Sequence, residues 1–484
     1  MHFTRYTSHA ITCTESTTLI SPSPHETDGV PEPARRWAVI SVAIGVGMAS
    51  LDTAIANTAL PGIAAQLNTT PAASVWIVNT YQLAMVATLL PFAALGEIVG
   101  YRRVSIFGLA LFALASLACA LAWSLPTLVI ARLFQGIGAA AIMGVNSALL
   151  RAIYPSRLLG RGFGTNAVVV ATGFALGPSL ASLILSVGAW PWLFAINVPL
   201  GVAGCVVAYR ALPRTRLATH RFDWLTAAYN AGAFGMLILA FGDAAHLTSP
   251  GTLAAEVGLM LIFLILLLRR QAEHAAPMLP VDLFRRPLFA LSALTAVCTF
   301  ATQGLAFISL PFYFETVLGR TPIETGFLMT PWAVLVGIMA PIAGRLSDRY
   351  SPGLLGGAGL AALSVGMGTL VFLPTVATAF DIGWRMAVCG VGFGFFQAPN
   401  IKALMSSAPP GRSGGASGIV ATARLTGQAM GAALVAFCMT VSVVNGPRYG
   451  LMLGVGFAAV ASIASFSRLR FHNDAYTAGI VKAD

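Results

Sequence analysis

Long apolar stretches alternate with short polar segments along almost the whole chain. Fourteen of these stretches come close to the roughly 20 residues that an α-helix needs to cross a lipid bilayer. The spans at 222–243 and 252–268 are the weakest, because acidic residues crowd their ends. We predict membrane-spanning helices at 38–61, 74–95, 104–123, 127–150, 163–188, 192–212, 222–243, 252–268, 288–314, 323–343, 354–374, 381–401, 413–440 and 448–466.

Composition and charge both fit a multi-pass protein of the cell (inner or plasma) membrane. Apolar residues make up 57% and charged residues 9%, and the mean hydropathy is +0.80, which excludes an ordinary soluble domain. If both termini are cytoplasmic, three of the 28 Lys and Arg residues face outward (Arg320, Arg385 and Arg448) and two lie within spans (Arg132 and Arg424). The remaining 23 are then cytoplasmic, as the positive-inside rule predicts. The net charge of +11 therefore indicates topology and not a nucleic-acid partner.

The chain repeats itself at an offset of 254 residues. Because the offset joins spans four and five to spans twelve and thirteen, we predict two six-helix bundles from a parallel duplication, with two helices inserted between them. Small residues recur in any packed membrane bundle, which explains the number of glycines but not their shared register. The aligned glycines are Gly136 and Gly390, Gly138 and Gly392, Gly160 and Gly414, Gly164 and Gly418, Gly173 and Gly427, and Gly177 and Gly431.

The predicted fold is therefore an all-α integral membrane protein built from five consecutive units. Residues 1–36 are rich in Ser, Thr, Pro and His and lack the apolar core of a signal peptide, so we expect a disordered cytoplasmic tail or a start assigned too early. The other units are an N-terminal six-helix bundle at 37–212, two inserted transmembrane helices with flanking cytoplasmic loops at 213–287, a C-terminal six-helix bundle at 288–466 and a cytoplasmic tail at 467–484.

Asp52 is the only carboxylate near the middle of any predicted span. It follows Trp37 by about 15 residues, which places it roughly 22 Å into an apolar core about 30 Å thick. An acid at that depth faces a bundle interior or a water-filled cavity and indicates a proton or ion pathway. The alternative is a buried polar group that fixes helix contacts.

Two motifs inside the spans carry the lone charges of the first bundle. Residues 51–61 read LDTAIANTALP and residues 132–139 read RLFQGIGA. They resemble the first-helix signature and the intramembrane R-x-x-Q-G-x-G motif of the fourteen-helix drug:proton antiporter branch of the Major Facilitator Superfamily, although Ala54 stands where the signature has threonine. The resemblance extends over about 37–466. It implies that Asp52 and Arg132 lie close together and couple transport to protons, since a fixed guanidinium would oppose the effect of burial on the acid's proton affinity. A purely structural role for Arg132 is the alternative.

Two loops resemble the family's cytoplasmic gating motif, G-x-L-x-D-R-x-G-R-R. The first departs from the motif at Ala93, Glu97 and Ile98, whereas the second keeps the leading glycine and the Asp-Arg pair. Carboxylates near helix N-termini can pair with arginines across the cytoplasmic face, and breaking such pairs would bias two rigid-body states. The alternative is a solvated charged turn that enforces topology. The candidate gating residues are Glu97, Gly100, Arg102, Arg103, Gly344, Asp348 and Arg349.

Span five contains the sequence GFALGPSLAS at 173–182, which resembles the antiporter signature G-x-x-x-G-P-x-x-G-G. Gly173 and Gly177 share one helix face and permit close helix contact, and Pro178 removes a backbone hydrogen bond and kinks the helix. Ala181 and Ser182 replace the last two glycines of the signature. The resemblance implies export in preference to import.

Polar residues inside the spans are the candidates for contact with a substrate, and an interhelical hydrogen bond is the alternative role for each. Aromatic faces such as that of Tyr81 would attract organic cations. The candidates are Asn79, Tyr81, Gln82, Gln303, Gln397 and Asn400.

The resemblance implies a proton-coupled antiporter that exports small amphipathic drugs or toxic compounds by alternating access, with organic cations as the expected charge class. The alternatives are a proton-coupled transporter of a specific metabolite, such as an organic acid or siderophore, and a non-transporting membrane sensor. The sequence has no Walker loop, nucleophile elbow or metal-binding spacing, so we expect no enzyme, catalytic residue, cofactor or metal. The expected partners are the substrate, protons and the lipid bilayer, and an outer-membrane or periplasmic partner is left open.

Overall fold

The computed structural model describes residues 29–215, 217, 222–245, 249–272, 281–374, 376–407 and 413–480. Within these residues, fourteen helices are long and apolar enough to cross a membrane, which confirms the predicted all-α class and the number of spans. Most of the expected tail at 1–36 lies outside the described residues, and α1 already begins at Ala34.

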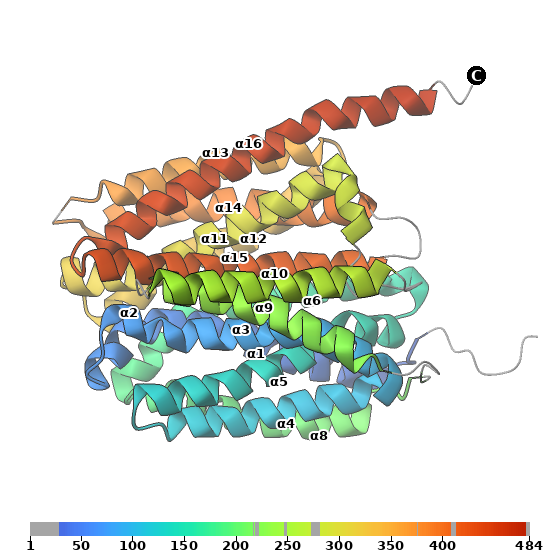
Figure 1. Ribbon diagram of the computed structural model, residues 1–484, viewed down its shortest axis with the longest axis horizontal. Coiled ribbons are helices and arrows are strands. Elements are labelled where there is room, and N and C mark those ends of the chain that lie inside the picture. The colour runs from blue at the N-terminus through green and yellow to red at the C-terminus, as the bar shows by residue number, and fades with distance from the viewer. Residues whose placement is uncertain are drawn as a thin grey trace, which may run out of the picture.

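Two bundles of helices lie side by side (Figure 1), with α1–α8 in blue to green and α11–α16 in yellow to red. The first bundle contains α1 (Ala34–Gln66), α2 (Pro71–Ser74), α3 (Trp76–Val99), α4 (Tyr101–Ala120), α5 (Leu125–Ile153), α6 (Leu159–Val187), α7 (Pro191–Ala195) and α8 (Asn197–Ala211). The second contains α11 (Pro287–Phe312), α12 (Pro322–Leu346), α13 (Pro352–Val371), α14 (Ala379–Ser407), α15 (Ser413–Val441) and α16 (Gly446–Ile480).

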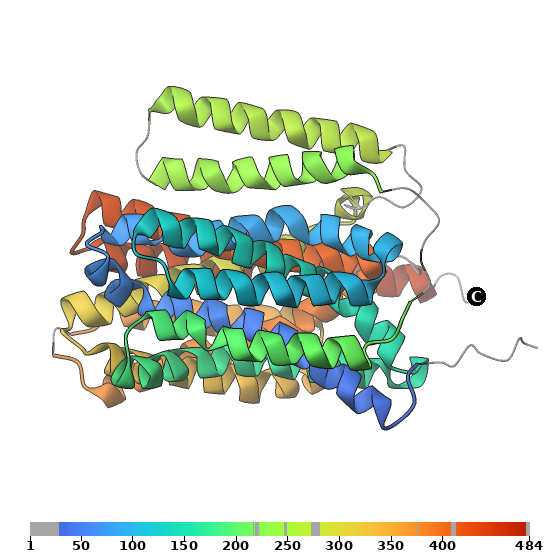
Figure 2. The ribbon, with the colours of Figure 1, turned by 90° about the horizontal axis from the view of Figure 1, so that it is seen from below.

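The inserted helices α9 (Trp224–Ala245) and α10 (Pro250–Ala272) form a hairpin outside both bundles (Figure 2). α9 packs against α3 and α15, where the two bundles meet, and α10 packs against α9. Only 6% of the most apolar window of α10 is buried, so the rest of this surface is left for lipid.

Local sequence explains where several helices begin. Ser124 and Thr321 form capping boxes with Thr127 and Glu324, and the Ser351 side chain accepts the Leu354 N–H. These contacts satisfy backbone donors that the first helical turn leaves free. α5, α12 and α13 also have proline at one of their first two positions, where its missing N–H costs nothing.

The sequence repeat is also a structural repeat. The first and last residues of α5 and α14 differ by 254, and the same shift relates α6 to α15. Two of the aligned pairs, Gly136 with Gly390 and Gly138 with Gly392, make equivalent contacts. A Cβ on Gly138 would lie 2.7 Å from the Phe112 nitrogen in α4, and one on Gly392 would lie 2.5 Å from the Leu363 nitrogen in α13. The shared register therefore preserves the same close helix packing in both bundles.

The bundles touch most closely through α6 and α12, at the end of the molecule opposite the start of α1 and the end of α16. Ser179 Oγ lies 2.7 Å from Thr330 Oγ1, and the Ser182 hydroxyl donates to the Pro322 carbonyl at 3.3 Å. Nearer the end where α1 begins, a Cβ on Gly164 in α6 would meet no other atom within 4 Å. Two hydrogen-bonding contacts therefore join α6 to α12 near that end.

Candidate functional site

Asp52 lies at the centre of a polar cluster inside the first bundle. Its Oδ2 accepts from Arg132 at 2.5 Å, and its Oδ1 accepts from Gln135 at 2.8 Å and from Asn197 at 2.9 Å. All four residues are at most 1% exposed. The structure thus brings Asp52 and Arg132 into contact, as the sequence predicts. Removing one member of such a buried pair typically costs about 3–5 kcal/mol, because it leaves an uncompensated charge.

Arg132 is held on every side by other groups of the same bundle. Its Nε donates to the Ile77 carbonyl at 3.1 Å, and its NH1 donates to Gln135 Oε1 at 2.6 Å. The rings of Tyr81 and Phe194 lie 4.2 and 5.6 Å from the guanidinium carbon. Arg132 and Gln135 are three residues apart on α5, so one helix face presents both side chains to Asp52.

The glycines of α6 pack against the turn of α1 that carries Asp52. A Cβ on Gly173 would lie 3.0 Å from the Ser50 Cβ, and one on Gly177 would lie 2.3 Å from the Ala54 Cβ. Ser50 and Ala54 flank Asp52 on α1, two residues away on each side. The predicted close-contact stripe of α6 is therefore a contact with α1, and a movement of either helix would disturb the other.

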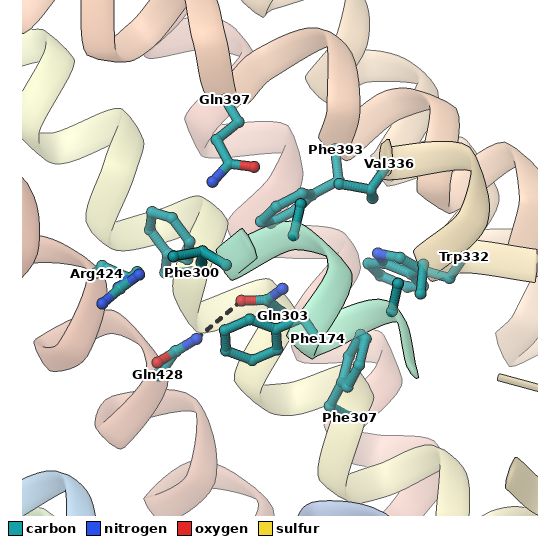
Figure 3. Close-up of a pocket in the computed structure, with 14 residues that line it drawn as sticks. Phe174, Phe300, Gln303, Phe307, Trp332, Val336, Phe393, Gln397, Arg424 and Gln428 are labelled. Atoms are coloured by element: carbon teal, nitrogen blue, oxygen red, sulfur yellow. Dashed lines mark hydrogen bonds between the residues drawn. The ribbon is translucent and has the colours of Figure 1, made fainter. Parts of the chain in front are cut away.

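A central cavity lies between the bundles and draws on α6, α11, α12, α14 and α15 (Figure 3). The volume of this cavity is about 30 Å³, which is far below the roughly 300–1,000 Å³ of a drug-sized site. A substrate would therefore have to move side chains apart in order to bind. The lining residues are Val170, Ala171, Phe174, Ala175, Phe300, Gln303, Phe307, Trp332, Ala333, Val336, Phe393, Gln397, Arg424 and Gln428.

The six predicted substrate residues fall into four groups. Gln303 and Gln397 line the central cavity, and Gln303 accepts a 2.9 Å hydrogen bond from Gln428. Tyr81 covers Arg132, as described above. Asn79 and Gln82 are buried outside the cavity lining, and their side-chain oxygens have no hydrogen-bond partner among the described residues.

The sixth candidate, Asn400, belongs to a second buried cluster around Arg468 in α16. Arg468 donates to Asn400 Oδ1 at 2.7 Å, to Ser292 Oγ at 3.0 Å and to the Ser465 hydroxyl, and it is 1% exposed. The Asn400 amide in turn donates to the Ser292 carbonyl at 3.2 Å. The geometry gives Asn400 the interhelical hydrogen bond that was the alternative to substrate contact.

The predicted gating residues lie at the end of the molecule where α1 begins. Gly100 separates α3 from α4 with φ of 103°, a conformation that favours glycine, and Arg102 donates to the Tyr209 carbonyl of α8. Asp348 accepts from Lys402 of α14 at 2.6 Å. Each of these two contacts joins segments of a single bundle. Of the remaining candidates, Arg103 donates to the Val99 carbonyl, and Glu97, Gly344 and Arg349 complete the two loops.

Sequence reasoning missed several residues that the structure places at these sites. Asn197 completes the Asp52 cluster, and Lys402 pairs with Asp348. Arg424 and Trp332 line the central cavity. Arg424 had a usable signal, because it is a lone charge inside a span, whereas neutral residues such as Asn197 had none.

Comparison with known proteins finds relatives that extend along most of the chain. The family profile described as the Major Facilitator Superfamily matches residues 42–432. The uncharacterized transporter YebQ of Escherichia coli (strain K12) is 49% identical over 92% of this chain and 98% of YebQ. The riboflavin transporter RibZ of Clostridioides difficile (strain 630) is 29% identical over 82% and 87%. The multidrug resistance protein Stp of Mycobacterium tuberculosis (strain CDC 1551 / Oshkosh) is 31% identical over 82% and 74%.

Among solved structures, the fold resembles a bacterial homolog to the human lysosomal transporter Spinster. The TM-score is 0.66 at 14% identity, and the match covers 91% of this chain and 98% of the other. At that identity the likeness concerns the fold, and it confirms the predicted class of membrane bundle.

Proposed function

Because the chain belongs to the Major Facilitator Superfamily, and is therefore a multi-pass secondary transporter and not an enzyme, we propose that it is a proton-coupled antiporter. In this proposal it exports small amphipathic compounds by alternating access. The observation that carries the proposal is the contact of Asp52 with Arg132, next to the turn of α1 that packs against α6.

Protonation of Asp52 would change the contacts within the cluster selectively. A neutral carboxylic acid loses its ion pair with Arg132, while Gln135 and Asn197 still donate to the other oxygen. The proton would therefore loosen α1 from α5 without dismantling the cluster. Since α6 packs on the same turn of α1 and on α12, this change reaches the contact between the bundles.

The charge distribution supports a cytoplasmic position for both termini. In that orientation the hydrogen bonds between α6 and α12 lie toward the outer end, and their opening and closing would be part of the alternation. Protonation and substrate would then favour opposite-facing states, so that the inward proton gradient drives export. Export of drug-like compounds is supported by the similarity to the multidrug resistance protein Stp.

Transport of a specific organic acid is the second candidate, and one observation favours it. The central cavity is lined by a single charged residue, Arg424, which would attract an acid. A substrate panel separates the two candidates, since a dedicated acid transporter would accept few of the compounds that a drug exporter accepts.

The proposal is tested by dye efflux from cells that produce the protein. We expect loaded ethidium, rhodamine 123 or fluorescein to leave faster than from control cells, and a protonophore to abolish the difference. Efflux that persists after the proton gradient collapses would contradict proton coupling.

A further inference from the structure

The central cavity has a positive charge that no acidic residue of its lining balances. Arg424, on α15, is the one charged residue of the lining, and the lining contains no carboxylate. Asp52, the buried acid of the first bundle, already pairs with Arg132. The guanidinium of Arg424 therefore adds net charge to the cavity itself.

Arg424 also differs in its hydrogen bonding from Arg132 and Arg468, two other arginines inside the bundles. Arg132 bonds to Asp52, Gln135 and a backbone carbonyl, and Arg468 bonds to Asn400 and two serines. Arg424 forms no hydrogen bond or ion pair with any other described residue. Arg424 is half-buried. A guanidinium carries five N–H donors and no acceptor, so one that lines a cavity and lacks protein partners invites an acceptor from a ligand.

A second unpaired donor faces the same cavity. The Trp332 indole nitrogen is buried and lacks a hydrogen-bond partner among the described residues. Arg424 and Trp332 lie on opposite sides of the cavity, with aromatic side chains between them (Figure 3). The two ends of the cavity thus both offer donors, which favours a ligand that carries acceptors.

The side chains between these donors are suited to contact a planar apolar body once they move apart. Phe300 and Phe393 meet edge to face at 5.7 Å, and Phe393 and Trp332 lie 6.5 Å apart. Phe174 and Phe307 complete the aromatic lining (Figure 3). Aromatic walls bind flat rings through offset or edge-to-face contacts.

We propose that the central cavity selects aromatic carboxylates, with the carboxylate paired to Arg424, the ring between the phenylalanines and an acceptor near Trp332. This inference rests on the proposed export function, and it replaces the organic cations expected from the sequence with anions. A cation would face like-charge repulsion from Arg424 in a low-dielectric site, and cation–π attraction is weaker than that repulsion. Exchange of an outgoing anion for an incoming proton would also be driven by an interior-negative membrane potential.

The test compares dyes that share one scaffold and differ in charge. Purified protein in detergent is titrated with fluorescein, an anionic xanthene carboxylate, and with rhodamine 123, a cationic amino-substituted xanthene whose carboxylate is esterified. Binding is followed by fluorescence anisotropy. We expect fluorescein to bind at least about tenfold more tightly, as charge-assisted bonds typically allow. Tighter binding of rhodamine 123, or binding of neither dye, would overturn the proposal.

Variants then assign the preference to one side chain. Arg424→Gln should weaken fluorescein binding by about tenfold or more and remove the preference, and Arg424→Lys should keep part of it. The matched control is Arg385→Gln, since Arg385 lies outside the cavity and pairs with Asp381 at 3.0 Å. An unchanged fluorescein affinity in Arg424→Gln, at normal thermal stability, would overturn the proposal. If that variant does not fold, the charge preference of the natural protein still decides.

Binding needs no proton gradient, so the two hypotheses fail separately. Loss of the anion preference would leave proton-driven export standing. Conversely, efflux that does not depend on the proton gradient would overturn the proposed antiport. If the protein still preferred the anionic dye, the assignment of the cavity would stand.

Discussion

Asp52 connects three helices through one carboxylate, because its partners Arg132 on α5 and Asn197 on α8 lie across from α1. The contact with Arg132 could be predicted, since each residue is a lone charge inside a span and a buried charge needs a partner. Asn197 could not be predicted, because a neutral amide inside a span looks the same in sequence whether it binds a carboxylate, a carbonyl or a substrate.

At the scale of single residues, the tight packing of Gly177 against α1 is directly testable. Gly177→Ala should reduce efflux strongly, because the added Cβ would lie 2.3 Å from the Ala54 Cβ and would push α6 away from the turn that holds Asp52. The matched control is Gly164→Ala in the same helix, where an added Cβ meets no other atom within 4 Å. Efflux and membrane expression are measured for both variants, and normal efflux in Gly177→Ala would show that this contact does not matter for transport.

Among the elements, the α9–α10 hairpin depends on contacts at its ends. Arg270 of α10 donates to Asp223 at 2.9 Å, and Asp223 also accepts from the backbone and hydroxyl of Thr226 at the start of α9. These donors hold the pKa of the Asp223 carboxyl well below its ordinary value of 3.8. The existence of both helices could be predicted from their apolar length, but their position could not, because they have no counterpart in the repeat.

This pair predicts a defined pH dependence. A lowered pKa stabilises the fold fully above the ordinary value of 3.8, and the contribution is lost as the pH falls below that value towards the folded-state pKa. Asp223 and Arg270 are partly exposed, so the contribution is at most about 1 kcal/mol. Thermal unfolding should show Asp223→Asn slightly less stable than the natural protein from pH 8 to pH 5, with the difference shrinking in more acidic buffer. A difference that grows on acidification would contradict the assignment.

Across the whole molecule, the two bundles contact each other most extensively through α6 and α12, and the central cavity lies between them. The repeat predicted the pair of bundles because it preserves the positions at which helices approach closely. It could not predict the conformation, since alternating access uses the same sequence in at least two arrangements. The residues that line the cavity could not be predicted either, because Arg424 and Trp332 come from helices far apart in the chain.

Locking the α6–α12 contact should stop transport. Ser179 Oγ and Thr330 Oγ1 are 2.7 Å apart, so cysteines at both positions are close enough for a disulfide after a small rotation. Oxidation of the double variant should abolish efflux and a reductant should restore it, while each single variant remains active. Full efflux from the cross-linked protein would show that the bundles need not separate there.

The most direct test of the central claim is gradient-driven efflux by Asp52→Asn in proteoliposomes. The amide keeps the size of the side chain and the acceptor for Gln135 and Asn197, but it cannot carry the coupling proton. Asp381→Asn is the matched control, since that acid pairs with Arg385 outside the cluster. The account predicts that Asp52→Asn loses efflux driven by the proton gradient and retains substrate exchange without a gradient, while Asp381→Asn keeps both. Full gradient-driven efflux by Asp52→Asn would contradict the account.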